Sequence, residues 1–436
     1  MAGEWIDCTL ADACRSIDYG LTASAVDTAE GPRFLRITDI VAGHIDWKTV
    51  PGVATDDETA GKYRLDDEDV VLARTGASTG TSAYIKAPPS AVFASYLVRL
   101  KAKPEFDSRF LSYYMKSDQF WTFIRGVLGD KSAQPNASAS TMTKAPLHAP
   151  KSKDEQRAIA HILGTLDDKI ELNRRMNATL EAMARALFKS WFVDFDPVRA
   201  KAEGRDAGLP PHIADLFPDS FEDLELGEIP RGWDVGPILA TARLLSGGTP
   251  KTDRPEYWNG GIPWASAKDV SQCGESFLVE TERTITARGL EESATQVIPA
   301  LCSIVVARGA TTGRMVVLGD AMAMNQTCYA LSTILSTPFA LYCHMRHEID
   351  NLVHAAHGSV FDTITTSTFA ASKVVLPPRP LFEEFEERVS PLFRRVLAGT
   401  RAVRTLAALR DTLLPKLISG KLRVAGPQLP IGKETR

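Results

Sequence analysis

The chain has 436 residues, 24% of them charged, and its length predicts two to four domains. Its formal net charge of −4 argues against a protein that coats DNA through bulk positive charge, although it is compatible with local basic patches. The sequence has neither a run of about 18 apolar residues nor a signal-peptide pattern, so we expect a cytoplasmic protein with no membrane partner.

The first 150 residues predict a mixed globular region. Short β-type runs such as Asp69–Ala73 are bounded by Gly and Pro, and Arg109–Met115 carries a helical pattern. We therefore assign this region to the α+β class.

A long helix is predicted over about residues 154–193. Its apolar positions alternate four and three residues apart, which is the spacing of a coiled-coil seam: Ile159, Leu163, Leu166, Ile170, Leu180, Ala184, Leu187 and Trp191. Asn173 and Asn177 fall at polar positions of the seam and are candidates for fixing the register of a helix pair. At 1.5 Å per residue, the helix would be roughly 60 Å long.

Residues 226–380 predict a second α+β region, and a second heptad pattern runs from Phe385 to Leu417. Neither apolar stripe can be buried alone. We therefore expect the two long helices to pack together, antiparallel, as a coiled coil within one chain. The alternative is that each helix packs as an amphipathic helix on its own domain.

The chain repeats itself once. Trp5 and Trp233 are 228 positions apart, and Asp39 and Asp269 are 230 apart. In the strongest match, VLARTGASTG at 71–80 resembles VVARGATTG at 305–313, which pairs Arg74 with Arg308. The matches keep their order and nearly their spacing, so we predict two copies of one unit in a pseudo-two-fold arrangement.

The segment after the first long helix carries the most specific pattern. It reads FKSWFVDFDPVRAK at 188–201 and ends in EIPRGW at 228–233. This segment resembles the central region of the specificity subunits of Type I restriction–modification systems. The blocks LDDKIELN at 166–173 and GGTP at 247–250 are similar to the same family, and the resemblance covers essentially the whole chain.

The resemblance implies a first target-recognition domain at 1–150, a central helical spacer and linker at 151–225, a second target-recognition domain at 226–380 and a C-terminal helical spacer at 381–436. It implies a non-catalytic subunit that reads a bipartite sequence in double-stranded DNA. Its implied partners are two methyltransferase subunits and motor–nuclease restriction subunits. The methyl donor, ATP and magnesium would belong to those partners, so we expect no cofactor on this chain.

Motifs for chemistry are missing from the sequence. The glycine-rich turns lack the Lys of a phosphate-binding loop, and we find neither a methyltransferase motif nor a G-x-S-x-G elbow. The six cysteines form no C-x-x-C pair. His344 with His347 and His354 with His357 share a helical spacing, but neither pair fits H-E-x-x-H. We expect no catalytic residue and no metal, although an undetected hydrolase is a third hypothesis.

The two glycine-rich turns allow two interpretations. They could hold phosphate oxygens with their hydroxyls, or they could be tight turns that need glycine for a positive φ. Because both copies carry the turn, it cannot distinguish the two half-sites, and base contacts should come from residues that differ between the copies. The candidates for DNA contact are polar and basic: Arg36, Arg74, Thr75, Ser78, Lys131, Gln134, Asn136, Lys251, Lys268, Arg308, Thr311 and Thr312.

Two interpretations also stand for the aromatic run at the end of the first long helix. Trp191, Phe192 and Phe195 could anchor a partner subunit, or they could be core residues. For the whole chain, the alternative to a DNA-recognition subunit is a coiled-coil scaffold protein without DNA binding, which would show no salt-dependent affinity for DNA.

Overall fold

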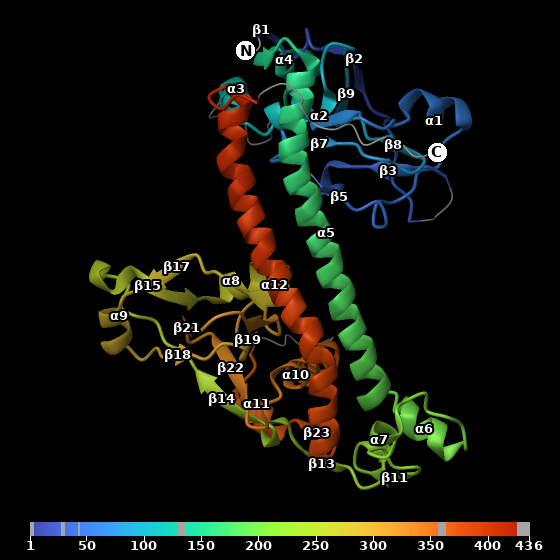
Figure 1. The fold of residues 1–436 in the computed structure, drawn as a ribbon, viewed down its shortest axis with the longest axis vertical. Helices are drawn as coiled ribbons and strands as arrows, with labels where there is room; N and C mark the ends of the chain where they lie inside the picture. The colour runs from blue at the N-terminus through green and yellow to red at the C-terminus, as the bar shows by residue number, and fades with distance from the viewer. Residues whose placement is uncertain (1–3, 28–30, 42–43, 130–135, 356–362, 425–436) are drawn as a thin grey trace. The chain divides into compact units, whose positions relative to one another are not determined.

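The computed structural model describes residues 4–27, 31–41, 44–129, 136–355 and 363–424. The chain divides into two compact units, one made of residues 1–170 with 405–436 and the other of residues 171–404 (Figure 1). Two 40-residue helices, α5 (Lys153–Phe192) and α12 (Arg379–Ile418), each contribute to both units. The expected first helix, at about 154–193, is therefore confirmed to within a residue at each end.

The first unit is built on a four-stranded antiparallel sheet. Its strand order is β2-β9-β6-β7, with bounds Cys14–Tyr19, Leu97–Ala102, Val70–Ala73 and Ser82–Tyr84. Smaller pairs are antiparallel β1–β10 (Trp5–Thr9 and Pro146–Pro150), parallel β3–β8 (Arg33–Leu35 and Ala91–Phe93) and antiparallel β4–β5 (Ile40–Val41 and His44–Ile45). The α-helices between the strands are α1 (Asp57–Tyr63), α2 (Ser108–Tyr114), α3 (Asp118–Leu128) and α4 (Ala139–Met142).

The second unit has a five-stranded sheet in the order β14-β22-β19-β20-β16, with bounds Ala242–Ser246, Cys328–Thr333, Ser303–Val306, Met315–Leu318 and Phe277–Leu278. A four-stranded sheet has the order β17-β15-β21-β18, with bounds Arg283–Ile285, Trp258–Ala265, Met322–Met324 and Val297–Ile298. Two antiparallel pairs complete the unit: the hairpin β11–β12 (Phe221–Leu224 and Gly227–Pro230), and β13–β23 (Asp234–Pro237 and Lys373–Leu376), whose strands are distant in the sequence. The α-helices are α6 (Asp196–Ala202), α7 (Pro211–Ala214), α8 (Ala267–Gln272), α9 (Ala287–Glu291), α10 (Pro338–Ala355) and α11 (Thr366–Ala371).

The two units share a common strand plan. The order β2-β9-β6-β7 of the first unit corresponds to β14-β22-β19-β20 of the second, and the parallel pair β3–β8 corresponds to β15–β21. The pair β1–β10 likewise corresponds to β13–β23, which joins the start of each repeat to the segment before its long helix. The predicted α+β class and internal repeat are confirmed.

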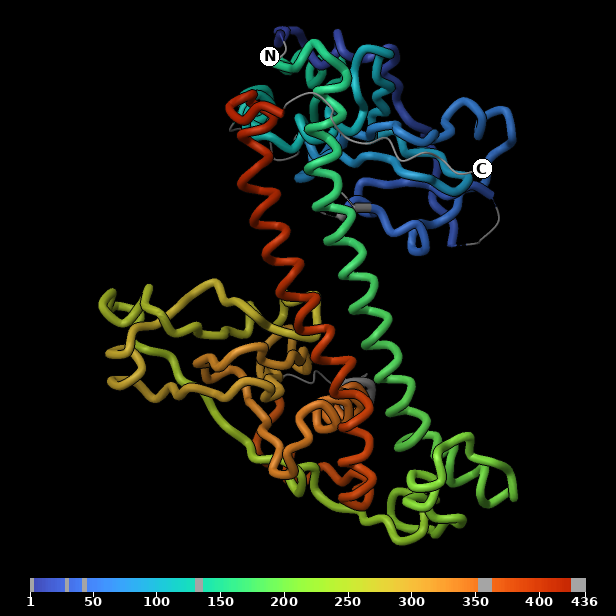
Figure 2. The backbone as a smooth tube through the Cα atoms, viewed as in Figure 1, coloured from blue at the N-terminus to red at the C-terminus, as the bar shows by residue number. Residues whose placement is uncertain are grey.

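Within the first unit, the long helices pack antiparallel. Arg423 Nε donates to Glu155 Oε1 at 3.0 Å, and Arg410 Nη1 donates to Asp167 Oδ1 at 2.8 Å. The partner's number falls as the residue number in α5 rises, which is the pattern of antiparallel neighbours. The start of α5 therefore lies beside the end of α12 in this unit (Figure 2).

The second unit shows the same direction of packing. Asn177 Nδ2 donates to Thr400 Oγ1 at 3.4 Å, and the Phe192 and Phe382 rings lie 6.1 Å apart. Buried residues of α12, among them Val389 and Val396, face α5 in one apolar cluster. The coiled-coil prediction is confirmed, and the alternative of two helices packed on separate domains is not what the structure shows.

Asn177 meets a glycine on the facing helix. Its side chain is 4% exposed, and a Cβ built on Gly399 would lie 2.3 Å from Asn177 Oδ1. Asn173 is half-buried, so the two candidates for fixing the register differ in their surroundings. A role in register stays a prediction for both residues.

We expect Gly399→Val to destabilise the second unit by about 1–3 kcal/mol, because the added atoms overpack the contact with Asn177. Combining it with Asn177→Ala should restore part of the loss, since the smaller side chain makes room. A double-mutant cycle on melting curves measures this coupling. Strictly additive effects would show that the two residues do not share one packing site.

Candidate nucleic-acid interface

The two glycine-rich turns have the same hydrogen bonds. In the first unit, Thr79 Oγ1 donates to Gly76 O at 2.7 Å and Gly80 N donates to Ala73 O at 2.9 Å. In the second unit, Thr312 Oγ1 donates to Gly309 O at 2.7 Å, and Gly313 N donates to Val306 O at 2.9 Å. The two turns therefore share one hydrogen-bonding pattern.

Glycine is required here by the backbone. Gly76, Gly80, Gly309 and Gly313 have φ of 73°, 96°, 100° and 88°, values that side chains with a Cβ rarely adopt. The tight-turn interpretation therefore accounts for the glycines. Contact of the turn hydroxyls with phosphate remains a prediction, and the Thr312 hydroxyl already donates within its own turn.

These hydrogen bonds correct the alignment of the two copies. Ala73 corresponds to Val306, because each accepts the bond from the last glycine of its turn. Arg74 therefore corresponds to Ala307, and Arg308 corresponds to Thr75. Pairing Arg74 with Arg308 was wrong by one residue, because the two turns have the same length from the acceptor to the last glycine, whereas that pairing leaves one residue of the first turn without a counterpart.

A second segment lies beside each turn. Thr75 forms an antiparallel β-bridge with Asn136, and Arg308 forms one with Thr363. The flanking bonds also agree, since Ala137 N donates to Arg74 O at 3.0 Å and Ile364 N donates to Ala307 O at 2.7 Å. Two candidates from distant parts of the sequence, Thr75 and Asn136, thus come together in the first unit, and Arg308 lies beside Thr363 in the second. Two more candidates, Lys131 and Gln134, lie outside the described residues.

The Arg74 side chain contacts two neighbouring side chains and does not project freely into solvent. Its Nη2 donates to Asn136 Oδ1 at 3.3 Å, and its guanidinium carbon lies 5.1 Å from the centre of the Tyr19 ring. Ser78, next in the turn, is half-buried. In the second unit, Thr311 is exposed and accepts a hydrogen bond from Ser271 Oγ at 2.6 Å.

Two of the basic candidates are paired with carboxylates. Arg36 makes a bidentate contact with Asp39 at 2.8 and 3.1 Å, and this contact raises its pKa. Lys268 Nζ lies 2.6 Å from Glu282 Oε2, which raises the pKa of Lys268. Either side chain would have to leave its carboxylate to contact phosphate. Lys251 is exposed in the loop before β15.

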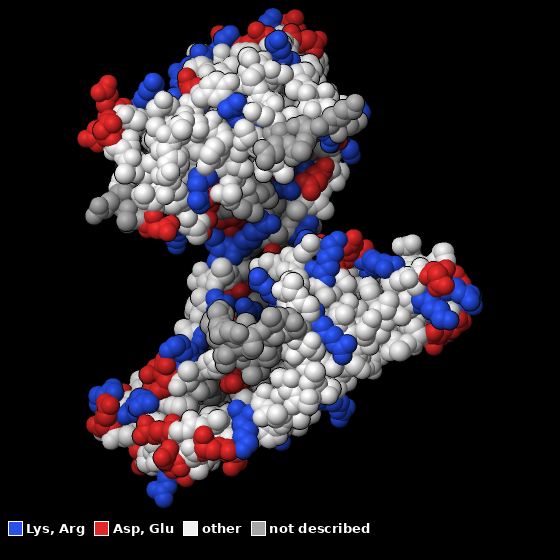
Figure 3. Space-filling view, turned by 180° about the vertical axis from the view of Figure 1, so that it is seen from behind, with Lys and Arg blue, Asp and Glu red and all other residues white. Residues whose placement is uncertain are grey.

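Surface charge is mixed over the face drawn in Figure 3, where basic and acidic side chains alternate on each unit. This agrees with the slightly negative net charge of the chain. On this face, DNA contact would depend on particular side chains more than on a continuous basic surface.

The aromatic run at the end of α5 is buried in the second unit. Trp191, Phe192 and Phe195 are 1%, 8% and 8% exposed. Their rings contact Phe217, Phe385, Phe382 and Trp233. The structure thus supports the core-packing interpretation of these three residues rather than an accessible partner interface, because the α12 pairing and the segment after α5 cover them.

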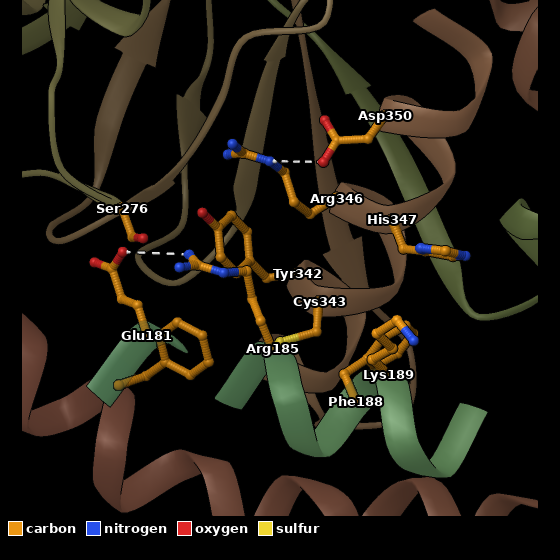
Figure 4. Close-up of a pocket in the computed structure, with 11 residues that line it drawn as sticks. Glu181, Arg185, Phe188, Lys189, Ser276, Tyr342, Cys343, Arg346, His347 and Asp350 are labelled. Atoms are coloured by element: carbon orange, nitrogen blue, oxygen red, sulfur yellow. Dashed lines mark hydrogen bonds and ion pairs between the residues drawn. The ribbon is translucent and has the colours of Figure 1, made fainter. Parts of the chain in front are cut away.

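A cavity of about 210 Å³ lies between α5 and α10 in the second unit (Figure 4). Four of its charged side chains form two pairs: Arg185 Nη1 with Glu181 at 3.8 Å, and Arg346 Nε with Asp350 at 3.4 Å. Lys189, which also lines the cavity, pairs with Asp194 outside the lining. Burial raises the pKa of the Cys343 thiol in its wall, which is the opposite of an activated nucleophile. The Cys343 thiol is therefore not poised as a hydrolase nucleophile in this cavity.

The helical histidines do not form a metal site in the described residues. Burial lowers the pKa of His344 to about 4, so this ring is neutral at pH 7. Over the described ranges, no three His, Cys, Asp or Glu side chains gather as metal ligands. The His354 side chain and His357 lie outside the described residues. Within those same ranges, no helix has both the length and the apolar character needed to cross a bilayer.

Comparison with known proteins decides the family. The profile of the Type I restriction modification DNA specificity domain matches the chain twice, at residues 28–182 and 230–386. The chain belongs to this family. Two matches of this kind account for the internal repeat, with one specificity domain in each copy.

Similar proteins agree with the family assignment. The HindI specificity subunit of Haemophilus influenzae is 27% identical over 364 residues, covering 72% of this chain and 77% of that protein. The MjaIX specificity subunit of Methanocaldococcus jannaschii is 26% identical over 332 residues, covering 73% and 69%. The crystal structure of the S subunit from M. genitalium has the same fold, with a TM-score of 0.61, 16% identity and coverage of 95% and 96%.

The chain is therefore a DNA-recognition component of a Type I restriction–modification system, not a catalytic one, and other subunits of such a system are its partners. The comparisons give no support to a scaffold protein without DNA binding. Sequence reasoning missed the glycines that follow β2 and β14, Gly20 and Gly247, which contact backbone in both units. The second of them lies in the GGTP block, so the repeat could have identified the pair.

Proposed function

We propose that this specificity subunit reads a bipartite DNA sequence, with one half of the target contacted by each recognition domain. We place those domains at residues 1–150 and 226–380, with the helical segments 151–225 and 381–436 as spacers. The observation that carries the proposal is the repeated turn and its neighbouring segment, which present polar side chains from the same backbone positions in both units.

The proposal assigns the chemistry to partner subunits. Two methyltransferase subunits would methylate adenine, and motor–nuclease subunits would cut DNA, with the methyl donor, ATP and magnesium bound by them. The complex would act in the cytoplasm, on the DNA of the cell. The candidate DNA contacts of this chain are Thr75, Ser78, Asn136, Lys251, Arg308, Thr311 and Thr312, with Arg36, Arg74 and Lys268 held by their own neighbours and Lys131 and Gln134 as further candidates.

DNA binding by the assembled methyltransferase complex tests the proposal. We expect the affinity for duplex DNA to fall steeply as salt rises, and a specific duplex to be preferred over a random one by at least about 10³-fold. The matched control is the methyltransferase subunits without this chain, which should lose the preference. A complex whose sequence preference is the same with and without the chain would favour the scaffold function.

A further inference from the structure

The β-bridge beside each turn carries different side chains in the two units. Thr75 and Asn136 face each other in the first unit, and Arg308 and Thr363 occupy the same two positions in the second. Residues opposite each other in an antiparallel pair point to the same side. Identical backbone with different side chains is the arrangement that lets two similar domains read different bases.

In the first unit the Asn136 side chain is exposed and oriented. Its Oδ1 accepts from Arg74 Nη2 at 3.3 Å, and the guanidinium of Arg74 lies over the Tyr19 ring. The register of the sheets places Ala307 and Ser246 at the positions of Arg74 and Tyr19 in the second unit. Arg74 and Tyr19, which orient the amide, therefore occur only in the unit whose bridge carries Asn136.

In the second unit the bridge carries a cation instead. Arg308 is exposed, and its guanidinium has no hydrogen bond or ion pair within the part of the chain that the structure describes. Other arginines of the unit, such as Arg254 and Arg288, are paired with glutamates. An unpaired guanidinium retains both of its parallel donors for a base edge.

We infer that this bridge is a base-reading position in each unit. Asn136 reads adenine in one half of the target, through the amide that bonds adenine N6 and N7, and Arg308 reads guanine in the other half, through O6 and N7. Arg74 is a positioning residue for Asn136. The inference rests on the proposed function, because it assumes that each unit contacts one half of the DNA.

The test is the methylation pattern of a strain whose only copy of the gene carries Arg308→Ala, with its partner subunits intact. We expect methylation to spread to sites that differ at one guanine in one half of the motif, with discrimination at that position reduced roughly 5- to 100-fold. Arg243→Ala is the matched control, since Arg243 is an exposed cation of the same unit on β14, and it should leave the motif unchanged.

Asn136→Ala should reduce discrimination at one adenine, in the half of the motif that the first unit contacts. The half that the second unit contacts should keep its sequence requirement. Arg74→Ala should relax the same adenine, and Arg74→Lys should restore part of the discrimination, because Lys can still donate to Asn136 Oδ1. A purely structural role for Arg74 would instead reduce methylation at all sites without relaxing any base.

Two results would overturn the inference. If Arg308→Ala and Asn136→Ala lower methylation equally at every site, the two residues contact phosphate and not bases. If both variants methylate the unaltered motif to the unaltered extent, neither residue contacts the target. In either case an intact split motif in the wild-type strain would keep the proposed function, whereas the absence of a split motif there would overturn the function itself.

Discussion

Gly247→Ala is expected to destabilise the second unit by about 3 kcal/mol or more and to abolish sequence-specific methylation by the complex. A Cβ at this position would lie 2.3 Å from Met324 O and 2.5 Å from Asn325 O. Both contacts are with backbone, in and just after strand β21, so no side-chain rotation can relieve them. Overpacking of this kind costs more than the usual surface substitution. Thermal unfolding measures the loss of stability directly.

Gly261→Ala is the matched control, because nothing lies within 4 Å of a Cβ at that position. It should melt within about 1 °C of the wild type, since surface substitutions usually change stability by less than about 0.5 kcal/mol. Gly20→Ala should behave like Gly247→Ala in the first unit, where Phe93 O and Ala94 O would both lie at 2.3 Å. Equal melting temperatures for Gly247→Ala and Gly261→Ala would contradict the close backbone approach.

Asp167→Ala should cost the first unit about 2–3 kcal/mol at neutral pH. The carboxylate of Asp167 accepts from Tyr113 Oη at 2.6 Å and from Arg410 Nη1 at 2.8 Å, and Lys116 Nζ lies 3.8 Å away. These groups come from α2, the turn after it, α5 and α12. Removing the carboxylate takes the counter-charge from Lys116 and leaves Arg410 paired with Asp411 alone, and the loss of one partner of a partly buried ion pair is among the more expensive substitutions.

The stability lost on Asp167→Ala should decrease as the pH falls. Burial alone would raise the pKa of Asp167, but Lys116, Tyr113 and Arg410 outweigh it, and the pKa is lowered. The stabilisation is therefore fully present above the unfolded pKa of about 3.9 and is lost as the pH falls through the lowered folded value. Melting curves of the wild type and the variant should converge below about pH 4.

Asp168→Ala serves as the control for this pair of predictions. Asp168 is the next residue, its side chain is 47% exposed, and it pairs with Arg109 and Lys86 at the surface. Exposed pairs contribute about 0–1 kcal/mol, so this variant should stay close to the wild type at every pH. If Asp168→Ala lowers the stability of the first unit as much as Asp167→Ala does, burial of the Asp167 network does not strengthen its ion pairs.

Periodicity was enough to predict the largest elements. The heptad spacing of α5 and α12 depends on burial of one helix face, which is a local property that a single sequence records. The turn glycines were predictable for a similar reason, because positive φ restricts the residue type at one position. The repeat then linked the two halves and gave the α+β plan of each unit.

Other features depend on contacts between distant residues. The sequence did not show that Asp39 forms an ion pair with Arg36, or Glu282 with Lys268, because an ion pair depends on the fold and not on composition. The one-residue shift between Arg74 and Arg308 was established by the hydrogen bonds of the turns and by the β-bridges beside them. Trp191 and its neighbours look the same in sequence whether a partner or the core covers them.

Adenine methylation of the source genome, read by long-read sequencing with and without this gene, tests the central claim most directly. DNA recognition by two similar units predicts that one split motif with an unspecified central gap loses its methylation on deletion and regains it when the gene is restored. Methylation that stays unchanged on deletion, with the partner genes intact and expressed, would contradict the account of this chain as the subunit that selects the target.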